Sequence, residues 1–256
     1  MLETRGLVKR FGGVCAVDDV SFTVRPSEVL GYLGPNGSGK TTTVNMLVGL
    51  IQPTRGDVRF DGQNIWDGIV EYRRRVGYVP EEPNLYPYLT GREYLELVGR
   101  LRGLPARLLD RKIAALLALF SLEPDGRSPL SSYSKGMRQK VLISAALLHD
   151  PDLLVFDEPA SGLDAASAVV FRHLIKALAQ AGKMVLYSSH ELETVERVAD
   201  RVVVLHEGRM VAYDSVEKLR TMMQLESLEA IFSELVFAED PQAVAGRIVD
   251  AVVSRS

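Results

Sequence analysis

The stretch that decides the fold is Gly34-Pro35-Asn36-Gly37-Ser38-Gly39-Lys40-Thr41. Its spacing, G-x-x-x-x-G-K-T, is typical of a loop that cradles nucleotide phosphates. An apolar run of strand length, residues 29–33, precedes it, and residues 42–50 can form a helix with Leu47 and Leu50 on the packed side. A glycine-rich turn followed by a helix N-terminus directs several backbone N–H groups at one point. The alternative, an ordinary glycine-rich turn, does not account for the strand before the loop and the helix after it.

Two side chains of this loop and the residue after it carry the expected chemistry. Lys40 can reach the β- and γ-phosphates of a nucleotide, and the Thr41 hydroxyl can bind Mg²⁺. Thr42 follows directly and is included in the expected phosphate site. The loop therefore predicts that the chain binds ATP together with Mg²⁺.

The composition describes a globular chain. It has 256 residues, of which 46% are hydrophobic and 25% are charged, and a formal net charge of −3. This balance gives no basic field that would indicate nucleic acid. Cys15 is the single cysteine, so a disulfide framework is excluded and a reducing cytoplasm is expected. The sequence contains neither a signal-peptide hydrophobic segment nor an apolar run long enough to span a membrane.

Strand patterns dominate the first part of the chain. Residues 2–33 alternate apolar and polar side chains, with an expected turn at Asp18-Asp19. Asp61-Gly62 predicts a hairpin within residues 53–66. A short apolar strand, residues 76–79, then stops at Pro80.

From about residue 82 to 149 the pattern becomes helical. Thr90 and Glu93 form a capping-box pattern, Pro105 opens a second helix, and Ser134 opens a third. Beyond this segment, strands are expected at 152–156, 184–188, 201–206 and 209–213, with helices near 164–180 and 191–198. Strands that alternate with helices around a helical insert predict an α/β core.

Three polar residues follow two of these predicted strands. Asp157 and Glu158 come directly after the apolar run 152–156, and His190 follows the strand 184–188. The carboxyl ends of parallel strands meet at one edge of a sheet, where the phosphate loop also lies. Asp157 can hold Mg²⁺, Glu158 can polarise an attacking water, and His190 can contact the γ-phosphate. Without the other motifs, Asp157 and Glu158 would be interpreted as solvated acidic residues at the end of a strand. His190 would be interpreted as a residue next to a helix N-cap with no role in catalysis.

A second potential anion site lies at a predicted helix N-terminus, in the segment Ser134-Lys135-Gly136-Met137-Arg138-Gln139-Lys140. Since the phosphate loop already accounts for one nucleotide, this segment suggests contact with a nucleotide held by another chain. A simple capped helix with a basic face is the alternative.

This set of motifs resembles the ATP-binding subunits of ABC transporters. Gly34–Thr41 resembles the Walker A loop, residues 153–158 the Walker B strand with its catalytic glutamate, and 133–137 the family signature. Residues 161–164 resemble the D-loop, His190 the switch histidine and Phe11 the aromatic residue that stacks on adenine. The resemblance covers about residues 2–220, with the motifs in the family's order.

The resemblance implies a P-loop NTPase (RecA-like) α/β core with an N-terminal antiparallel β subdomain and an inserted helical subdomain. The implied ATPase domain covers 1–220, with the helical subdomain at about 82–149 and a helical extension at 221–256. It also implies two ATP molecules at the interface with a second copy or a paralogous subunit, each contacted by Ser134, Gly136 and Met137 of the opposite chain. The resemblance places the chain at the cytoplasmic face of the cell membrane, where its other partner would be a separate multi-span permease and the expected direction of transport is export.

Two motifs depart from the family pattern. Lys135 and Met137 stand where glycine and glutamine are commonest, and Glu81 stands where the family usually has the Q-loop glutamine. Glu81 is expected to contribute an oxygen to Mg²⁺ together with Thr41 and Asp157. Both departures are similar to bacterial exporter-type subunits.

Two questions about the chain stay open at this point. A soluble ABC ATPase acting on nucleic acid or ribosomes is the alternative function, although the mildly acidic chain has one phosphate loop and no long heptad run. A regulator without turnover fits poorly with an intact Glu158. In the extension, an apolar stripe is expected to pack on the core or on a partner's extension, with a ligand site as the less favoured alternative. It consists of Leu228, Ile231, Phe232 and Leu235.

Overall fold

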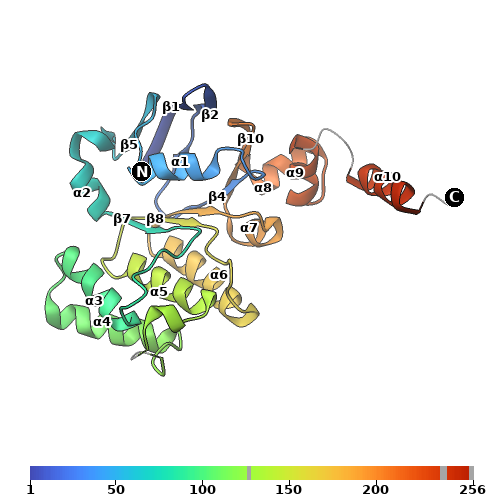
Figure 1. Cartoon of the computed structure of the whole chain (residues 1–256). Coiled ribbons are helices and arrows are strands. Elements are labelled where there is room, and N and C mark those ends of the chain that lie inside the picture. The colour runs from blue at the N-terminus through green and yellow to red at the C-terminus, as the bar shows by residue number, and fades with distance from the viewer. Residues whose placement is uncertain (126–127, 237–240, 254–256) are drawn as a thin grey trace.

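The computed structural model describes residues 1–125, 128–236 and 241–253. A six-stranded sheet in the middle of the molecule has the strand order β11-β10-β4-β9-β8-β7 (Figure 1). All neighbours pair in parallel except β10 and β11, which are antiparallel. The strands are β4 (Val29–Leu33), β7 (Val76–Val79), β8 (Leu153–Asp157), β9 (Met184–Ser188), β10 (Arg201–His206) and β11 (Arg209–Ser215).

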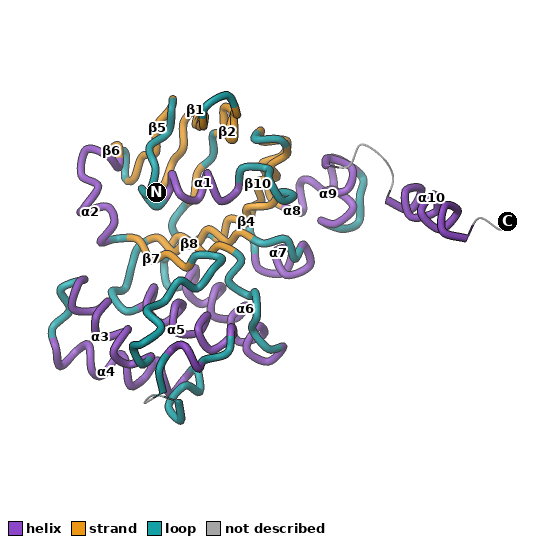
Figure 2. The backbone as a smooth tube through the Cα atoms, viewed as in Figure 1, coloured by secondary structure: helices purple, strands orange, loops and turns teal. Residues whose placement is uncertain are grey.

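The N-terminal part forms an antiparallel sheet above it (Figure 2). Its order is β2-β1-β5-β6, with β3 paired to β1. The predicted hairpin is present between β5 and β6, where Asp61 and Gly62 adopt φ of 51° and 83°. The strands are β1 (Leu2–Phe11), β2 (Val14–Val20), β3 (Thr23–Val24), β5 (Arg55–Phe60) and β6 (Gln63–Asn64).

The expected turn at Asp18-Asp19 is wrong. Both residues lie within β2, and the chain reverses instead after Phe11, next to Gly12. Leu7 pairs with Val20 but Lys9 pairs with Val17, so β2 has one extra residue at this point. The acidic pair therefore forms a β-bulge, with Asp19 at φ 58°.

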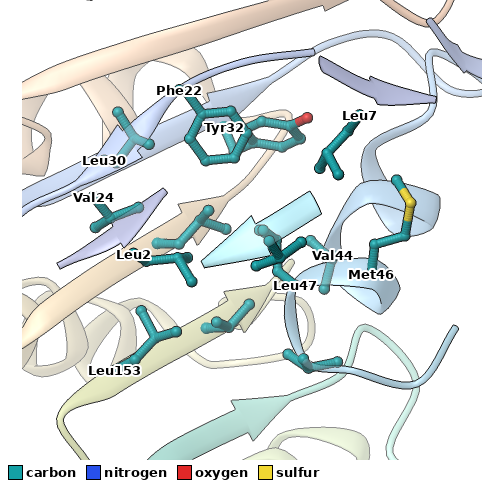
Figure 3. Close-up of a cluster of buried hydrophobic side chains, with 14 of the residues drawn as sticks. Leu2, Leu7, Phe22, Val24, Leu30, Tyr32, Val44, Met46, Leu47 and Leu153 are labelled. Carbon is teal, nitrogen blue, oxygen red and sulfur yellow. The ribbon is translucent and has the colours of Figure 1, made fainter. Parts of the chain in front are cut away.

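Helix α1 (Lys40–Leu47) lies between the two sheets and joins them into one core. Figure 3 shows Val44, Met46 and Leu47 of this helix among side chains from both sheets, including Leu2 and Leu30. The prediction that Leu50 packs inside is wrong, because the helix ends before it at Gly49, which has φ 74°, and Leu50 is 57% exposed. Because the phosphate loop joins β4 directly to α1, this core fixes the loop at both ends.

The opposite face of the central sheet is covered by helices (Figure 1). Helices α3, α4 and α5 follow β7 and precede β8 in the sequence. They form a small core of their own around Leu95, Ile113 and Val141. The Thr90–Glu93 capping box predicted for α3 is present. The helices are α3 (Gly91–Leu101), α4 (Ala106–Leu119), α5 (Lys135–Leu147), α6 (Ala165–Gln180) and α7 (Leu192–Val198). Short helical segments occur at η1 (Ile65–Gly68), α2 (Ile69–Arg74) and η2 (Leu130–Ser132).

The described residues after β11 are mainly helical, while residues 237–240 and 254–256 of the expected helical extension lie outside the described part. The helices are α8 (Val216–Met223), α9 (Leu228–Val236) and α10 (Pro241–Val253). Leu228 and Ile231 are fully buried, and Phe232 and Leu235 are partly buried against the same core cluster. The apolar stripe of the extension therefore packs on the core of its own chain.

Candidate nucleotide site

The phosphate loop adopts a backbone that requires glycine at several positions. Gly37 and Gly39 have φ of 81° and 99°, in the left-handed region. Gly34 has no room for a side chain, since a Cβ there would lie 2.4 Å from Ser38 Oγ and 2.7 Å from the carbonyl oxygen of Leu205. The neighbouring β1–β2 segment approaches equally closely, because a Cβ on Gly39 would lie 2.4 Å from the Ala16 carbonyl oxygen.

A cavity of about 540 Å³ opens beside this loop. It forms where β4 and β8 end, at the same edge of the parallel sheet, which is where ligands bind in open α/β folds. The following predicted residues line it: Gly34, Pro35, Asn36, Gly37, Gly39, Lys40, Thr41, Thr42, Glu81, Asp157, Glu158 and His190. Ser38 is buried and is not part of the lining. The sequence-predicted phosphate and catalytic residues are thus brought together by the fold.

Lys40 is held by the loop itself. Its Nζ donates hydrogen bonds to the carbonyl oxygens of Gly34, at 2.6 Å, and Pro35, at 3.2 Å. Burial lowers the pKa of the Lys40 ammonium, and the nearby carboxylates of Glu158, Asp157 and Glu81 oppose that shift. A phosphate in the cavity would offer this ammonium a stronger, charge-assisted acceptor than the two carbonyls.

Asp157 has the environment of a cation ligand. It is 1% exposed, and its Oδ2 is buried with no hydrogen-bond partner among the described residues. Burial raises the pKa of Asp157 to about 6, and the negative charges of Glu81 and Glu158 add to the rise. An orphaned carboxylate oxygen beside two further carboxylates is costly unless a positive charge joins them.

The oxygen ligands in the cavity lining suit a metal ion that binds together with a nucleotide. Within the described ranges, no three Asp, Glu, His or Cys side chains are grouped so that they could hold a metal ion alone. Mg²⁺ commonly binds to one or two carboxylates together with phosphate oxygens and water. Thr41, Glu81 and Asp157, all in the cavity lining, fit that pattern.

Glu158 and His190 contact each other across two strand ends. Nδ1 of His190 lies 2.8 Å from Oε2 of Glu158, and the Glu158 side chain is 10% exposed while that of His190 is 71% exposed. Glu158 has φ 48°, and its N–H donates to the Ser188 carbonyl oxygen at the end of β9. A glutamate in this sparsely populated conformation, fixed by a neighbouring strand, is characteristic of functional sites.

The signature residues lie elsewhere. Ser134, Gly136 and Met137 are not in the cavity lining; they open α5, where Ser134 Oγ accepts a hydrogen bond from the Met137 N–H at 3.2 Å. Lys135 Nζ donates to Ser161 Oγ at 2.7 Å, and a Cβ on Gly136 would lie 2.4 Å from the Gly162 carbonyl oxygen. The start of α5 therefore packs on the 161–164 loop of its own chain and does not line the cavity of that chain.

Phe11 is also outside the lining. It lies at the end of β1, is 51% exposed, and has Lys9 Nζ 5.1 Å from its ring centroid. The antiparallel sheet contributes Ala16 to the cavity instead.

Sequence reasoning missed four lining residues: Ala16, Ser189, Leu192 and Phe232. Ser189 and Leu192 flank His190 closely, so their proximity to the site could have been inferred from the chain. For Phe232 the sequence favours a packing stripe over a ligand site, and no motif surrounds it.

A glycine-rich phosphate loop between a parallel strand and a helix, with Asp157 and Glu158 at the next strand but one, defines a P-loop nucleoside-triphosphatase. A family model described as ABC transporter matches residues 17–161. The chain belongs to this family and is an ATP-binding, ATP-hydrolysing subunit of an ABC transporter.

Curated relatives agree with this assignment. The chain is 39% identical over 225 residues to the ABC transporter ATP-binding protein NatA of Bacillus subtilis, covering 87% of this chain and 92% of that protein. It is 38% identical over 221 residues to the Nod factor export ATP-binding protein I of Ralstonia nicotianae, covering 86% and 69%. The bacitracin transport ATP-binding protein BcrA of Bacillus licheniformis is 35% identical over 222 residues, with 85% and 72% covered.

Solved structures give the same fold. The ATP-binding subunit of an ABC transporter superposes with a TM-score of 0.87 at 36% identity, covering 92% of this chain and 99% of that one. A dimeric, post-hydrolysis ATP-binding cassette bound to ADP and phosphate superposes with a TM-score of 0.77 at 25% identity, covering 84% and 98%. None of the helices within 1–125, 128–236 and 241–253 has the length and apolarity needed to cross a bilayer.

Proposed function

We propose that two copies of this chain, or this chain and a paralogue, close head to tail around two ATP molecules. The observation that carries the proposal is the division of the site: the cavity collects the phosphate loop and the catalytic candidates, but Ser134, Gly136 and Met137 lie outside it. Ser134 is exposed at the N-terminus of α5, where it can meet a phosphate presented by another chain. The dimeric, nucleotide-bound relative supports this arrangement.

Within each site the roles follow from position. Lys40 and the N–H groups of Gly37 and Gly39 bind the phosphates, while Thr41, Glu81 and Asp157 hold Mg²⁺, which neutralises phosphate charge when bound. Glu158 accepts a proton from the attacking water, and His190 orients the Glu158 carboxylate through Nδ1 and faces the γ-phosphate. Phe11 is proposed to pack on the adenine from the antiparallel sheet.

The chain powers a separate permease at the cytoplasmic face of the membrane in this proposal. Four exposed apolar residues lie in the segment 82–101, which follows Glu81 directly: Tyr86, Tyr88, Leu97 and Leu101. Such side chains are suited to an interface, and their position lets closure at the cavity move the contact. The name of one relative, the Nod factor export ATP-binding protein I, favours export.

We propose that the chain has two parts, the first of which contains an inserted subdomain. Residues 1–220 form the ATPase domain, about 82–149 its helical subdomain, and 221–256 a C-terminal extension. The separate core around Leu95, Ile113 and Val141 supports the helical subdomain as a unit. Helix α8 continues across residue 220, so the extension is joined to the domain by a continuous helix.

The test is ATP-dependent dimer formation by the Glu158→Gln variant, measured by size-exclusion chromatography with light scattering. We expect a stable dimer with ATP and a monomer without it, because binding is intact but hydrolysis is blocked. A second substitution, Ser134→Arg, in the Glu158→Gln chain should abolish the dimer, while the monomer should still bind ATP. Loss of ATP binding by the Ser134→Arg chain would contradict a site shared between two chains.

A further inference from the structure

The C-terminal extension reaches the nucleotide cavity. Phe232 of α9 lines the same cavity as the phosphate loop and His190. Leu192, at the start of α7, is the other large apolar residue in the lining. Both Phe232 and Leu192 pack against the core cluster that underlies the sheet. Phe232 and Leu192 thus add apolar surface to a cavity lined mostly by polar residues and glycines, and Phe232 comes from a helix outside the ATP-binding motifs.

Helix α9 is firmly held in this position. Leu228 and Ile231, on the same helix, have no exposed surface. Burial of these two apolar side chains stabilises the attachment of the helix to the core. A helix attached in this way presents Phe232 to the cavity as a fixed surface.

Polar contacts tie the extension to the helix that follows the switch histidine. Glu196 of α7 forms an ion pair with Arg220 of α8 and accepts a hydrogen bond from the Leu228 N–H at 3.3 Å. Helix α7 begins at Leu192, two residues after His190. The same short helix therefore contacts the extension at Glu196 and the cavity at Leu192.

We propose that α9 is part of the ATP site, and that Phe232 contacts the bound nucleotide together with Leu192. This inference rests on the assignment of the cavity as the ATP site under the proposed function. Apolar side chains in the lining exclude water from the cavity and so strengthen the charge interactions between Lys40 and the phosphates. The extension then contributes directly to ATP affinity and takes part in every binding event at the site.

The chain offers a matched pair of variants for the test. Phe232 and Leu235 are both partly buried on α9 against the same cluster, but only Phe232 lines the cavity. ATP affinity of the full chain is measured by calorimetry with EDTA, so that no hydrolysis occurs, and melting temperatures report on folding. Phe232→Ala should weaken ATP binding roughly tenfold, Phe232→Leu should restore most of it, and Leu235→Ala should change it less than about twofold.

A fluorescent variant gives a direct reading of the contact. Phe232→Trp should show an ATP-dependent change in tryptophan emission, whereas Glu229→Trp, at an exposed position of α9, should not. The native Trp66 lies in η1 and its signal is subtracted with the unmodified chain.

Two results would overturn the inference. ATP affinity that is unchanged in Phe232→Ala, or lowered equally in Leu235→Ala, would show that α9 only supports the fold. Lys40→Ala separates this failure from that of the ATP site itself. If Lys40→Ala still binds ATP normally, the site assignment fails and the inference with it; if it loses ATP while Phe232→Ala does not, only the inference fails.

Discussion

Nδ1 of His190 lies 2.8 Å from Oε2 of Glu158, so the two catalytic candidates form one unit. His190 follows β9 and Glu158 follows β8, and these two strands pair in parallel along their whole length. The register of the sheet therefore sets the contact. The largely exposed imidazole can meet a phosphate while it orients the buried carboxylate.

Replacement of His190 by alanine should lower kcat for ATP hydrolysis by about 100-fold, because Glu158 loses the group that orients it. ATP affinity should change little, since Lys40 and the loop remain. His173→Ala, at an exposed position of α6, is the control and should retain wild-type kcat. Steady-state rates measured over a range of ATP concentrations separate kcat from KM. A His190→Ala chain with undiminished kcat would remove this residue from the mechanism.

Gly34→Ala should distort the phosphate loop, because a side chain at this position has no room. The new Cβ would meet Ser38 Oγ and the Leu205 carbonyl, and overpacking of this kind costs about 1–3 kcal/mol. ATP binding, measured by calorimetry, should weaken about 10- to 100-fold. Gly13→Ala is the matched control because no atom lies within 4 Å of its Cβ position. Equal affinities for the two variants would argue against a rigid loop.

Asp157→Asn tests the cation site. The substitution keeps the shape of the side chain and removes the charge that the orphaned Oδ2 carries. Mg²⁺ should then add little to the stabilisation given by ATP, whereas in the unmodified chain it should raise the melting temperature further. Thermal unfolding with ATP and EDTA, compared with ATP and Mg²⁺, measures the difference. A full Mg²⁺ effect in the variant would rule out Asp157 as a ligand.

His149 should make the fold sensitive to acid. Burial lowers its pKa to about 4, aided by the positive charge of Arg102, while its Nε2–H donates to the Val76 carbonyl oxygen at 3.0 Å. Because the folded pKa lies below the unfolded value, the unfolded chain binds more protons, and stability is lost as pH falls from about 6.5 to 4. Allowing for partial exposure, we expect about 2 kcal/mol from this residue.

The measurement is the free energy of unfolding in urea at pH 7 and at pH 4.5. His149→Gln should reduce the difference between the two pH values by about 2 kcal/mol, because glutamine does not titrate. An unchanged pH dependence would show that His149 is not the group responsible.

Much of the fold could be predicted from local patterns. Strand β9 spans Met184–Ser188, as its apolar run indicates, and the Thr90–Glu93 box and Ser134 cap open α3 and α5. The carboxylates Asp157 and Glu158 reach the phosphate loop because parallel strands end at a common edge. These features depend on neighbours in sequence or on one rule of sheet geometry.

The failures have a different origin. Asp18-Asp19 has the composition of a turn, but pairing with β1 keeps it in a strand as a bulge. Phe232 reaches the cavity although about 190 residues separate it from the phosphate loop, and only the packing of α9 on the core brings it there. Local propensity contains no information on either contact.

The central claim is that Ser134 of one chain closes the ATP site of another, and cross-linking tests it most directly. Two populations with the Cys15→Ser and Glu158→Gln substitutions are prepared, one with Asn36→Cys in the phosphate loop and one with Ser134→Cys, each with its own affinity tag. A short bismaleimide is added with or without ATP, and the products are separated by mass. We predict a covalent dimer that contains both tags and forms only with ATP. Both chains remaining monomeric with ATP, while each still binds it, would contradict the claim.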